Sequence, residues 1–208
     1  MPKERKNKFD ADNRMPLNAV EKSESVAENG IPLNVIEKSE SVSGGGMPQN
    51  MSRKREGKPL PVVMCIGSDR VSGDLLGPAV GRKLIEEYNL RAYVYGTTGR
   101  NINGANIDFY DGFIREIHKE SKVVAVDACL GSGREIGKIK IGYRGVGAGY
   151  AVRKAGKRYG DVGIVGIVAE NAEDNVMQLI SVEVSLIEEM SGRIAEYLAN
   201  NLDALTGE

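Results

Sequence analysis

Tryptophan is absent from this chain, histidine occurs once, cysteine twice, and aromatic residues make up only 5% of the 208 residues. With so few aromatic side chains, we do not expect a stacking platform for bases or sugars. The single histidine, His118, argues against a metal site built from several histidines. The two cysteines, Cys65 and Cys129, are too few for a disulfide framework and favour a reducing, cytoplasmic setting.

An excess of charge of one sign and long apolar runs are missing as well. The formal net charge is -1, which gives no reason to expect a basic surface for nucleic acid. No apolar run approaches the roughly 18–20 residues that span a bilayer. The segment Met1–Arg14 is charged and lacks the apolar core of a secretory signal. We therefore expect a cytoplasmic protein with neither a nucleic-acid nor a membrane partner.

Composition changes sharply near residue 60. Residues 1–59 are rich in Ser, Asn, Gly, Glu and Lys, and their apolar residues are too thinly spread to bury a core. They include a tandem 16-residue repeat, Met15–Gly30 followed by Ile31–Gly46. A solenoid needs about three stacked units, so two copies do not make one. We predict a disordered low-complexity tail, which is either a docking or processing segment or the result of a recent duplication.

Residues 60–202 alternate strand and helix patterns, ahead of a C-terminal tail at 203–208. Apolar, β-branched or alternating runs predict strands at 61–66, 91–95, 122–126, 137–143 and 162–168. The run 137–143 is typical of a half-exposed strand, antiparallel at an edge. Amphipathic spacing predicts helices at 75–88 and 107–120, and a long helix from Asp174 or Asn175 through Leu198. This alternation predicts an α/β fold, a three-layer α/β/α sandwich with a mainly parallel sheet.

Two aspartates follow two of the predicted strands. Asp74 lies in the glycine-containing segment 67–78, after the strand that ends at Ile66, and Asp127 directly follows the strand that ends at Val126. Parallel strands bring their carboxyl ends to one edge of the sheet, where ligands bind in open α/β folds. If the two strands are neighbours, the two carboxyl groups could share a proton and activate a water molecule.

The residues alone leave other roles open. Asp74 could be only a helix N-cap, and Asp127 only a turn residue at a strand end. At a helix start, the helix dipole would favour the ionised form of Asp74, and Asp127, nearer the buried strand, would hold the proton. Glycines on both sides of Asp74 would let the backbone turn tightly there. Asp69, on the same loop, could assist the pair or merely pair with Arg70.

Two rival centres are weaker. A nucleophilic Cys129 would need His118 as its base, but the two residues flank the strand 122–126 at opposite ends, more than about 15 Å apart at 3.3 Å per residue. We therefore expect both cysteines to be packing residues. The glycine-rich, basic loop 145–160 lacks the order of a dinucleotide site or a P-loop. It is either a mobile, substrate-facing loop or a plain connector.

Taken together, these motifs resemble the YyaC-type sporulation proteins of spore-forming Firmicutes, which are relatives of the germination protease that degrades small acid-soluble spore proteins. The matching stretches are spread over most of residues 61–198: 65–70 with 73–78, 94–97, 126–131 and, more weakly, 160–162 with 166–168. The resemblance implies a phosphorylase/hydrolase-like fold, which hydrogenase maturation proteases share. The stretch 169–174 departs from the family pattern.

The resemblance also implies site residues. By motif, the catalytic aspartate pair of the germination protease falls on Asp74 and Asp127. Residues of the same motifs are then expected to bind substrate: Asp69, Arg70, Thr97, Cys129 and Gly131. In the maturation proteases, carboxylates at the two aspartate positions help to bind nickel together with a downstream histidine. This chain has no histidine after His118, so we expect neither a metal nor another cofactor.

We therefore predict a spore-associated, peptidase-like hydrolase of the forespore or mother cell. Ionised Asp74 would be the general base, and protonated Asp127 would polarise the scissile carbonyl. The assignment within the pair stays open because coupled carboxyl groups titrate as a unit. The partners would be peptides or proteins, with small acid-soluble spore proteins as the substrates that the resemblance offers, and a homo-oligomer is left open. The alternatives are a non-catalytic sporulation protein that binds a peptide or protein through the same cleft, and a metal-dependent amidase or maturation-type protease.

Overall fold

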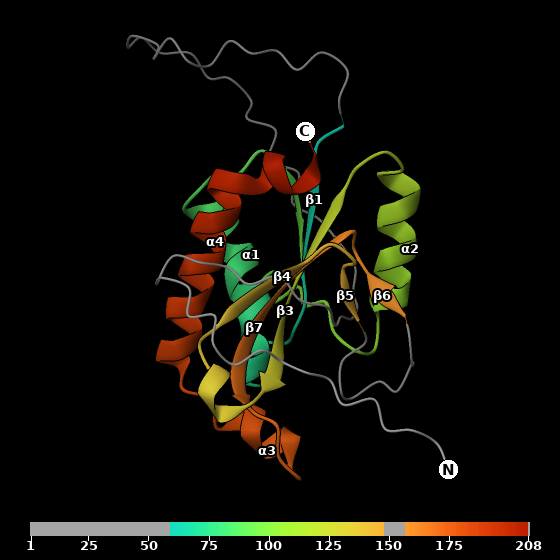
Figure 1. The fold of residues 1–208 in the computed structure, drawn as a ribbon. Coiled ribbons are helices and arrows are strands. Elements are labelled where there is room, and N and C mark those ends of the chain that lie inside the picture. Colours follow the sequence, from blue (N-terminus) through green and yellow to red (C-terminus); the bar gives the residue numbers. More distant parts are fainter. Residues whose placement is uncertain (1–58, 148–156, 208) are drawn as a thin grey trace, which may run out of the picture.

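A five-stranded sheet lies between two layers of helices in the computed structural model, which describes residues 59–147 and 157–207 (Figure 1). The strands follow one another in the spatial order β2 (Tyr93–Tyr95), β1 (Val62–Cys65), β3 (Val123–Gly131), β7 (Val162–Glu170) and β4 (Ile139–Gly142). The first four are parallel, and β4 pairs antiparallel with β7 at the edge. The predicted α/β/α sandwich, its mainly parallel sheet and its antiparallel edge strand are confirmed.

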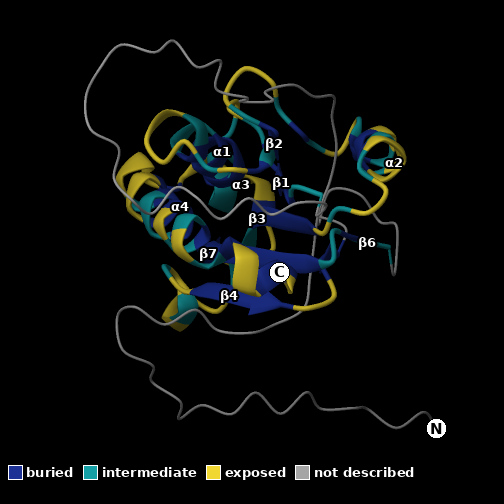
Figure 2. Ribbon diagram, turned by 90° about the horizontal axis from the view of Figure 1, so that it is seen from above, coloured by how far each residue is buried: buried dark blue, intermediate teal, exposed yellow. Residues whose placement is uncertain are grey.

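Helices cover both faces of the sheet. Helices α1 (Leu76–Glu86) and α4 (Val184–Thr206) pack together on one face, and α2 (Ile107–Ile117) covers the other, so the buried sheet lies between them (Figure 2). Successive side chains of a strand point to opposite faces. Accordingly, Val63 packs into the core beneath α1 and α4, whereas Met64 packs into the core beneath α2.

Smaller elements complete the described part of the chain. They are the short helices η1 (Gly73–Leu75), η2 (Gly133–Glu135) and α3 (Asn175–Ile180), and the hairpin strands β5 (Val146–Gly147) and β6 (Arg158–Tyr159). The hairpin adds buried residues to the α2 face. Helix α3 packs against η1 and β7, at the carboxyl edge of the sheet (Figure 1). This edge is where the sequence predicts the functional residues.

Several element boundaries differ from the sequence predictions. Strands β3 and β7 continue past residues 126 and 168 because they pair with each other beyond the end of β1. The predicted long C-terminal helix is two helices, α3 and α4, with a break at 181–183. Helix α4 continues through Thr206 with Leu205 buried in the core, so 203–206 belong to the helix and not to a separate tail.

Strand β4 is buried along its whole length, so the predicted half-exposed strand is wrong. The inward alternation of Ile139 and Ile141 is present, but Lys140 on the other face is also buried, with 9% of its surface exposed. Its ammonium group donates a hydrogen bond to Glu135 at 2.7 Å. The ion pair allows a lysine to lie where the alternation predicts solvent.

Two sequence predictions concern residues that the structure does not describe. The tail with its tandem repeat falls in 1–58, and the middle of the glycine-rich loop falls in 148–156. The described ends of that loop form the hairpin of β5 and β6. Within 59–147 and 157–207, no helix has the length and apolar character needed to cross a membrane.

Candidate active site

Asp127 lies within β3, opposite Val165 of β7. The sequence prediction placed it just past the end of the strand, which is wrong because β3 continues to Gly131. The neighbouring strand β1 ends at Cys65. The last backbone hydrogen bond on this side of β3 is donated by the Ile66 N–H to the Val126 carbonyl, at 2.7 Å. Asp127 is buried, with 8% of its surface exposed, and one carboxyl oxygen accepts the Ala128 N–H at 2.8 Å. Strand β3 therefore carries a buried carboxyl group directly after the last residue that pairs with β1.

Asp74 lies in η1, the short helix that leads into α1. Two glycines dock this turn onto the end of β1. A Cβ atom at Gly67, whose φ is +143°, would lie 1.9 Å from the Asp74 carbonyl oxygen, and one at Gly77 would lie 1.9 Å from the Ile66 carbonyl oxygen. Close approach, more than a tight turn, is thus the reason for Gly77. Neither η1 nor α1 has a side-chain N-cap, so the interpretation of Asp74 as a helix cap is wrong.

Burial and the charge of Asp74 both act on the carboxyl group of Asp127. Burial, and after it the negative charge of Asp74, hold the pKa of Asp127 well above its usual range, although the Ala128 N–H opposes this shift. Burial also raises the pKa of Asp74. Strands β1 and β3 are parallel neighbours, as the pairing of the two aspartates requires. Both causes act on Asp127, whereas burial alone acts on Asp74, which favours a proton on Asp127 and a negative charge on Asp74.

We expect Asp127→Asn to be more stable than the unchanged protein at neutral pH. The folded-state pKa of Asp127 is raised, so the folded state binds more protons than the unfolded state between the unfolded and folded pKa values. Stability therefore falls as the pH rises through this window. Asparagine carries no charge and can still accept the Ala128 N–H. The variant does not lose this stability, which amounts to about 1.4 kcal/mol of unfolding free energy for each unit by which the folded-state pKa of Asp127 exceeds the unfolded-state pKa.

Urea unfolding of both proteins at pH 4 and pH 8 measures this effect. The stability advantage of the variant should be larger at pH 8. An advantage of the same size at both pH values would show that the pKa of Asp127 is ordinary in the folded protein.

Asp69 and Arg70 lie on the turn after β1, and both are exposed. The Asp69 carboxylate accepts hydrogen bonds from the Asn101 side-chain amide at 2.6 Å and from the Gly99 N–H at 2.9 Å. These two bonds, that of Asn101 first, lower the pKa of Asp69. Asp69 thus anchors the loop after β2, a role not among those predicted for it, which were to assist the aspartate pair, to pair with Arg70 or to bind substrate.

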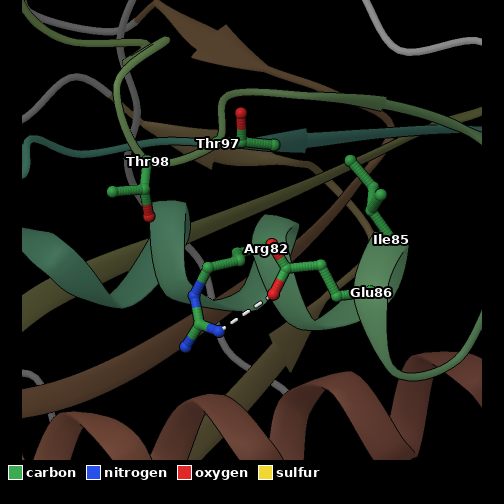
Figure 3. Close-up of a pocket in the computed structure, with 5 residues that line it drawn as sticks. All are labelled: Arg82, Ile85, Glu86, Thr97 and Thr98. Atoms are coloured by element: carbon green, nitrogen blue, oxygen red, sulfur yellow. Dashed lines mark hydrogen bonds and ion pairs between the residues drawn. The ribbon is translucent and has the colours of Figure 1, made fainter.

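Thr97 lines a pocket of about 170 Å³ between α1 and the segment that follows β2 (Figure 3). The pocket is lined by Arg82, Ile85, Glu86, Thr97 and Thr98. Arg82 forms an ion pair with Glu86 at 3.1 Å, so opposite charges of the lining pair with each other. Neither aspartate lines the pocket, and the structure does not bring Thr97 into the aspartate pair.

Cys129 and Gly131 follow Asp127 along β3. Burial, and to a lesser degree the charge of Asp127, raise the pKa of Cys129 to about 12, which keeps the thiol protonated. His118, the base that a nucleophilic Cys129 would need and that the sequence predicts to be out of reach, shares a hydrogen bond of 2.5 Å with the Tyr95 hydroxyl. A Cβ atom at Gly131 would lie 2.8 Å from the Ile167 side chain, so Gly131 permits close packing of β3 on β7. The packing role predicted for Cys129 agrees with its contact with the α2-side core.

One polar residue of this edge was predicted only as a helix cap. Asn175 begins α3 and is buried, with 5% of its surface exposed. Its Oδ1 accepts the Ala172 N–H at 2.8 Å, but its Nδ2 has no hydrogen-bond partner among the described residues. Asp174 is the actual cap, through a bond from the Met177 N–H to its carboxylate. The sequence predicts a cap at Asp174 or Asn175, but it does not show that Asn175 is buried, because burial depends on how α3 packs.

The ion pair of buried Lys140 with half-buried Glu135 was not predicted from the sequence either. Lys140 and Asp127 are both opposite Val165, on either side of it, so they occupy one row of the sheet. The hydrogen bond from Lys140 is the largest cause that lowers the pKa of Glu135, to about 2. The pair therefore places fixed opposite charges two strands away from Asp127.

The described residues do not assemble a metal site. Within them, no group of three or more His, Cys, Asp or Glu side chains is arranged to hold a metal ion. The nickel-binding set implied by the resemblance to maturation proteases needs a third ligand beside Asp74 and Asp127, and these residues do not supply it.

The fold and site define an α/β/α protein with a buried carboxyl group on β3 and a half-buried one on the turn after the neighbouring parallel strand β1. The chain belongs to the family described as protein of unknown function (DUF1256), whose model matches residues 46–197. It is similar to the uncharacterized protein YyaC of Bacillus subtilis strain 168, with 38% identity over 146 residues, or 70% of this chain and 71% of the relative. The resemblance to YyaC-type proteins drawn from the motifs is confirmed. Among solved structures, the NiFe hydrogenase maturation protease HycI of Thermococcus kodakarensis KOD1 is similar with a TM-score of 0.47 and 26% identity, covering 71% of this chain and 95% of that chain.

Proposed function

We propose that this protein is a spore-associated, peptidase-like hydrolase that uses Asp74 and Asp127 to activate water. The observation that carries the proposal is the pair itself: a buried carboxyl group on β3 whose pKa is raised in part by the charge of a second carboxyl group, on the turn after β1. Two carboxyl groups whose surroundings separate their pKa values can divide the work of base and acid. The motif resemblance to the germination protease supports the same two residues.

The proposed reaction follows from this distribution of protons. Ionised Asp74 accepts a proton from a water molecule, and the oxygen of that water attacks the scissile carbonyl carbon. Protonated Asp127 donates a hydrogen bond to the carbonyl oxygen, on which negative charge develops. The proton on Asp74 then passes to the leaving amine as the carbon–nitrogen bond breaks. The products are a carboxylic acid and an amine, and the pair returns to its singly protonated state.

Small acid-soluble spore proteins are the proposed substrates, because the resemblance that points to the aspartate pair is to the germination protease. The forespore or mother cell would then be the place of action. Both statements rest on the motifs quoted above and are open to a direct test.

The test is to incubate the purified chain with small acid-soluble spore proteins, with and without a chelator, beside a variant that carries both Asp74→Asn and Asp127→Asn. We expect cleavage by the unchanged chain, no effect of the chelator, and no cleavage by the variant. Cleavage that stops when the chelator is added would favour a metal-dependent amidase. Retained peptide binding without any cleavage would overturn the proposal and favour the non-catalytic alternative.

A further inference from the structure

Helix α3 presents apolar side chains to solvent beside the proposed site. Val176 and Ile180 are spaced four residues apart and therefore share one face of the helix, and Met177 lies next to them. Their exposed fractions are 64%, 49% and 52%. The outward face of a surface helix is normally polar, so three exposed large apolar residues on six helical positions call for an explanation.

The inner side of the same helix is fixed to the site. A Cβ atom at Gly73 would lie 2.7 Å from the Leu179 side chain, so α3 rests directly on the residue before Asp74. Asn175, one helical turn before Leu179, is buried on this side as well. The apolar face of α3 is therefore held at a fixed position next to the aspartate pair, at the end of the sheet to which β3 and β7 point (Figure 1).

Acidic residues surround this apolar face in the sequence. The chain has no Lys or Arg between Arg158 and Arg193. In the same interval, the residues that flank α3 on both sides include four exposed carboxylates: Glu170, Glu173, Asp174 and Glu183. Basic side chains at this edge come from other turns, at Arg70 and Arg134. An apolar face with an acidic border is complementary to a segment that combines apolar and basic side chains.

We propose that the outer face of α3, formed by Val176, Met177 and Ile180, docks a basic, amphipathic segment of the peptide substrate. The proposal rests on the proposed function, since it concerns how a substrate is presented to Asp74 and Asp127. Apolar side chains of the segment pack on the three residues, and its Lys or Arg side chains lie against the acidic border. The surface thereby selects substrates by the segment next to the scissile bond.

Fluorescence anisotropy with labelled peptides tests the docking surface without requiring cleavage. The full chain carrying Asp127→Asn is titrated against a helical peptide of Leu and Lys, and against its counterpart of Leu and Glu. We expect saturable binding of the Leu/Lys peptide, and binding of the Leu/Glu peptide at least about tenfold weaker. Equal binding of the two peptides, or no binding of the Leu/Lys peptide, would overturn the proposal.

Substitutions on α3 locate the surface. In the same Asp127→Asn background, Met177→Ser with Ile180→Ser should raise the Kd by about tenfold or more, because two apolar contacts are lost. Both side chains are half exposed, so the fold should tolerate the change. The matched control is Phe109→Ser with Ile117→Ser on α2, whose side chains are 53% and 60% exposed on another face of the molecule. An equal loss in the control would show non-specific binding and overturn the proposal.

Two further outcomes distinguish a failure of the docking proposal from a failure of the proposed peptidase function. Peptide binding that depends on α3, together with no cleavage by the unchanged chain, would support the surface and overturn only the peptidase. If the unchanged chain and the variant carrying Met177→Ser with Ile180→Ser cleave the substrate at the same rate, the result would support the peptidase and overturn the docking surface. A dimer in sedimentation that these substitutions dissolve would assign the face to a second copy of this chain and overturn the proposal.

Discussion

Asp74→Asn and Asp127→Asn each lower kcat/KM for peptide cleavage by about 10²–10⁴-fold, the range expected when one positioned acid or base is lost. Asparagine at 74 cannot accept a proton from water. Asparagine at 127 can still donate a hydrogen bond, but it cannot hold the proton that neutralises the developing negative charge, so its residual activity should be the larger of the two. The matched control is Asp203→Asn, an exposed carboxylate on α4, which should leave the rate unchanged.

The pH profile distinguishes a catalytic role from a structural one. Cleavage by a singly protonated pair rises with pH as the first carboxyl group ionises and falls as the second does. Because the pKa of Asp127 is well above its usual range, the falling limb should report Asp127, and it should be absent from the residual activity of Asp127→Asn. In Asp74→Asn, the loss of the neighbouring charge should lower the pKa of Asp127, while burial continues to raise it. An unchanged falling limb in Asp127→Asn would assign that limb to another group.

The sheet could be predicted because its strands are buried on both faces. The run 62–66 is entirely apolar and is followed by Gly67, and the run 162–168, which follows Asp161, contains only valine, isoleucine and glycine. The end of β3 could not be predicted in the same way. From Asp127 onward the run is interrupted by an acidic residue, and what keeps it in the sheet is its pairing with β7, which lies more than thirty residues further along the chain. Pairing between distant segments leaves no local signal.

The same limit explains what was missed at the site. Asp69 is held by Gly99 and Asn101, which lie 30 and 32 residues away in the sequence. The break between α3 and α4 contains neither glycine nor proline, and the apolar spacing continues across it because Val182 is buried. The aspartate pair was predicted because its placement needs only two neighbouring parallel strands. The proposed docking face of α3 could not be predicted from the sequence, because it depends on which side chains of the helix point outward.

Gly77→Ala should destabilise the protein by about 3 kcal/mol, the upper part of the usual cost of overpacking a close contact. The added methyl group would lie 1.9 Å from the Ile66 carbonyl oxygen and 2.6 Å from two further backbone atoms of the same residue. The backbone of Ile66, at the end of β1, is hydrogen-bonded to Val126 and cannot rotate away as a flexible side chain can, so α1 must move off β1. A single residue, Leu75, separates Asp74 from α1, so Asp74 would move with the helix. Cleavage should therefore fall together with the free energy of unfolding in urea.

Gly112→Ala is the matched control, because the same substitution is expected to change stability in the opposite direction there. Gly112 also lies in a helix, α2, but nothing lies within 4 Å of a Cβ atom placed there. Alanine should therefore stabilise that helix by up to about 1 kcal/mol, through helix propensity alone. The same chemical change thus has opposite effects at two helical positions, and the close approach of α1 to β1 decides between them. Stabilisation by Gly77→Ala would mean that α1 and the turn carrying Asp74 do not pack on β1 in the way that brings Asp74 to Asp127.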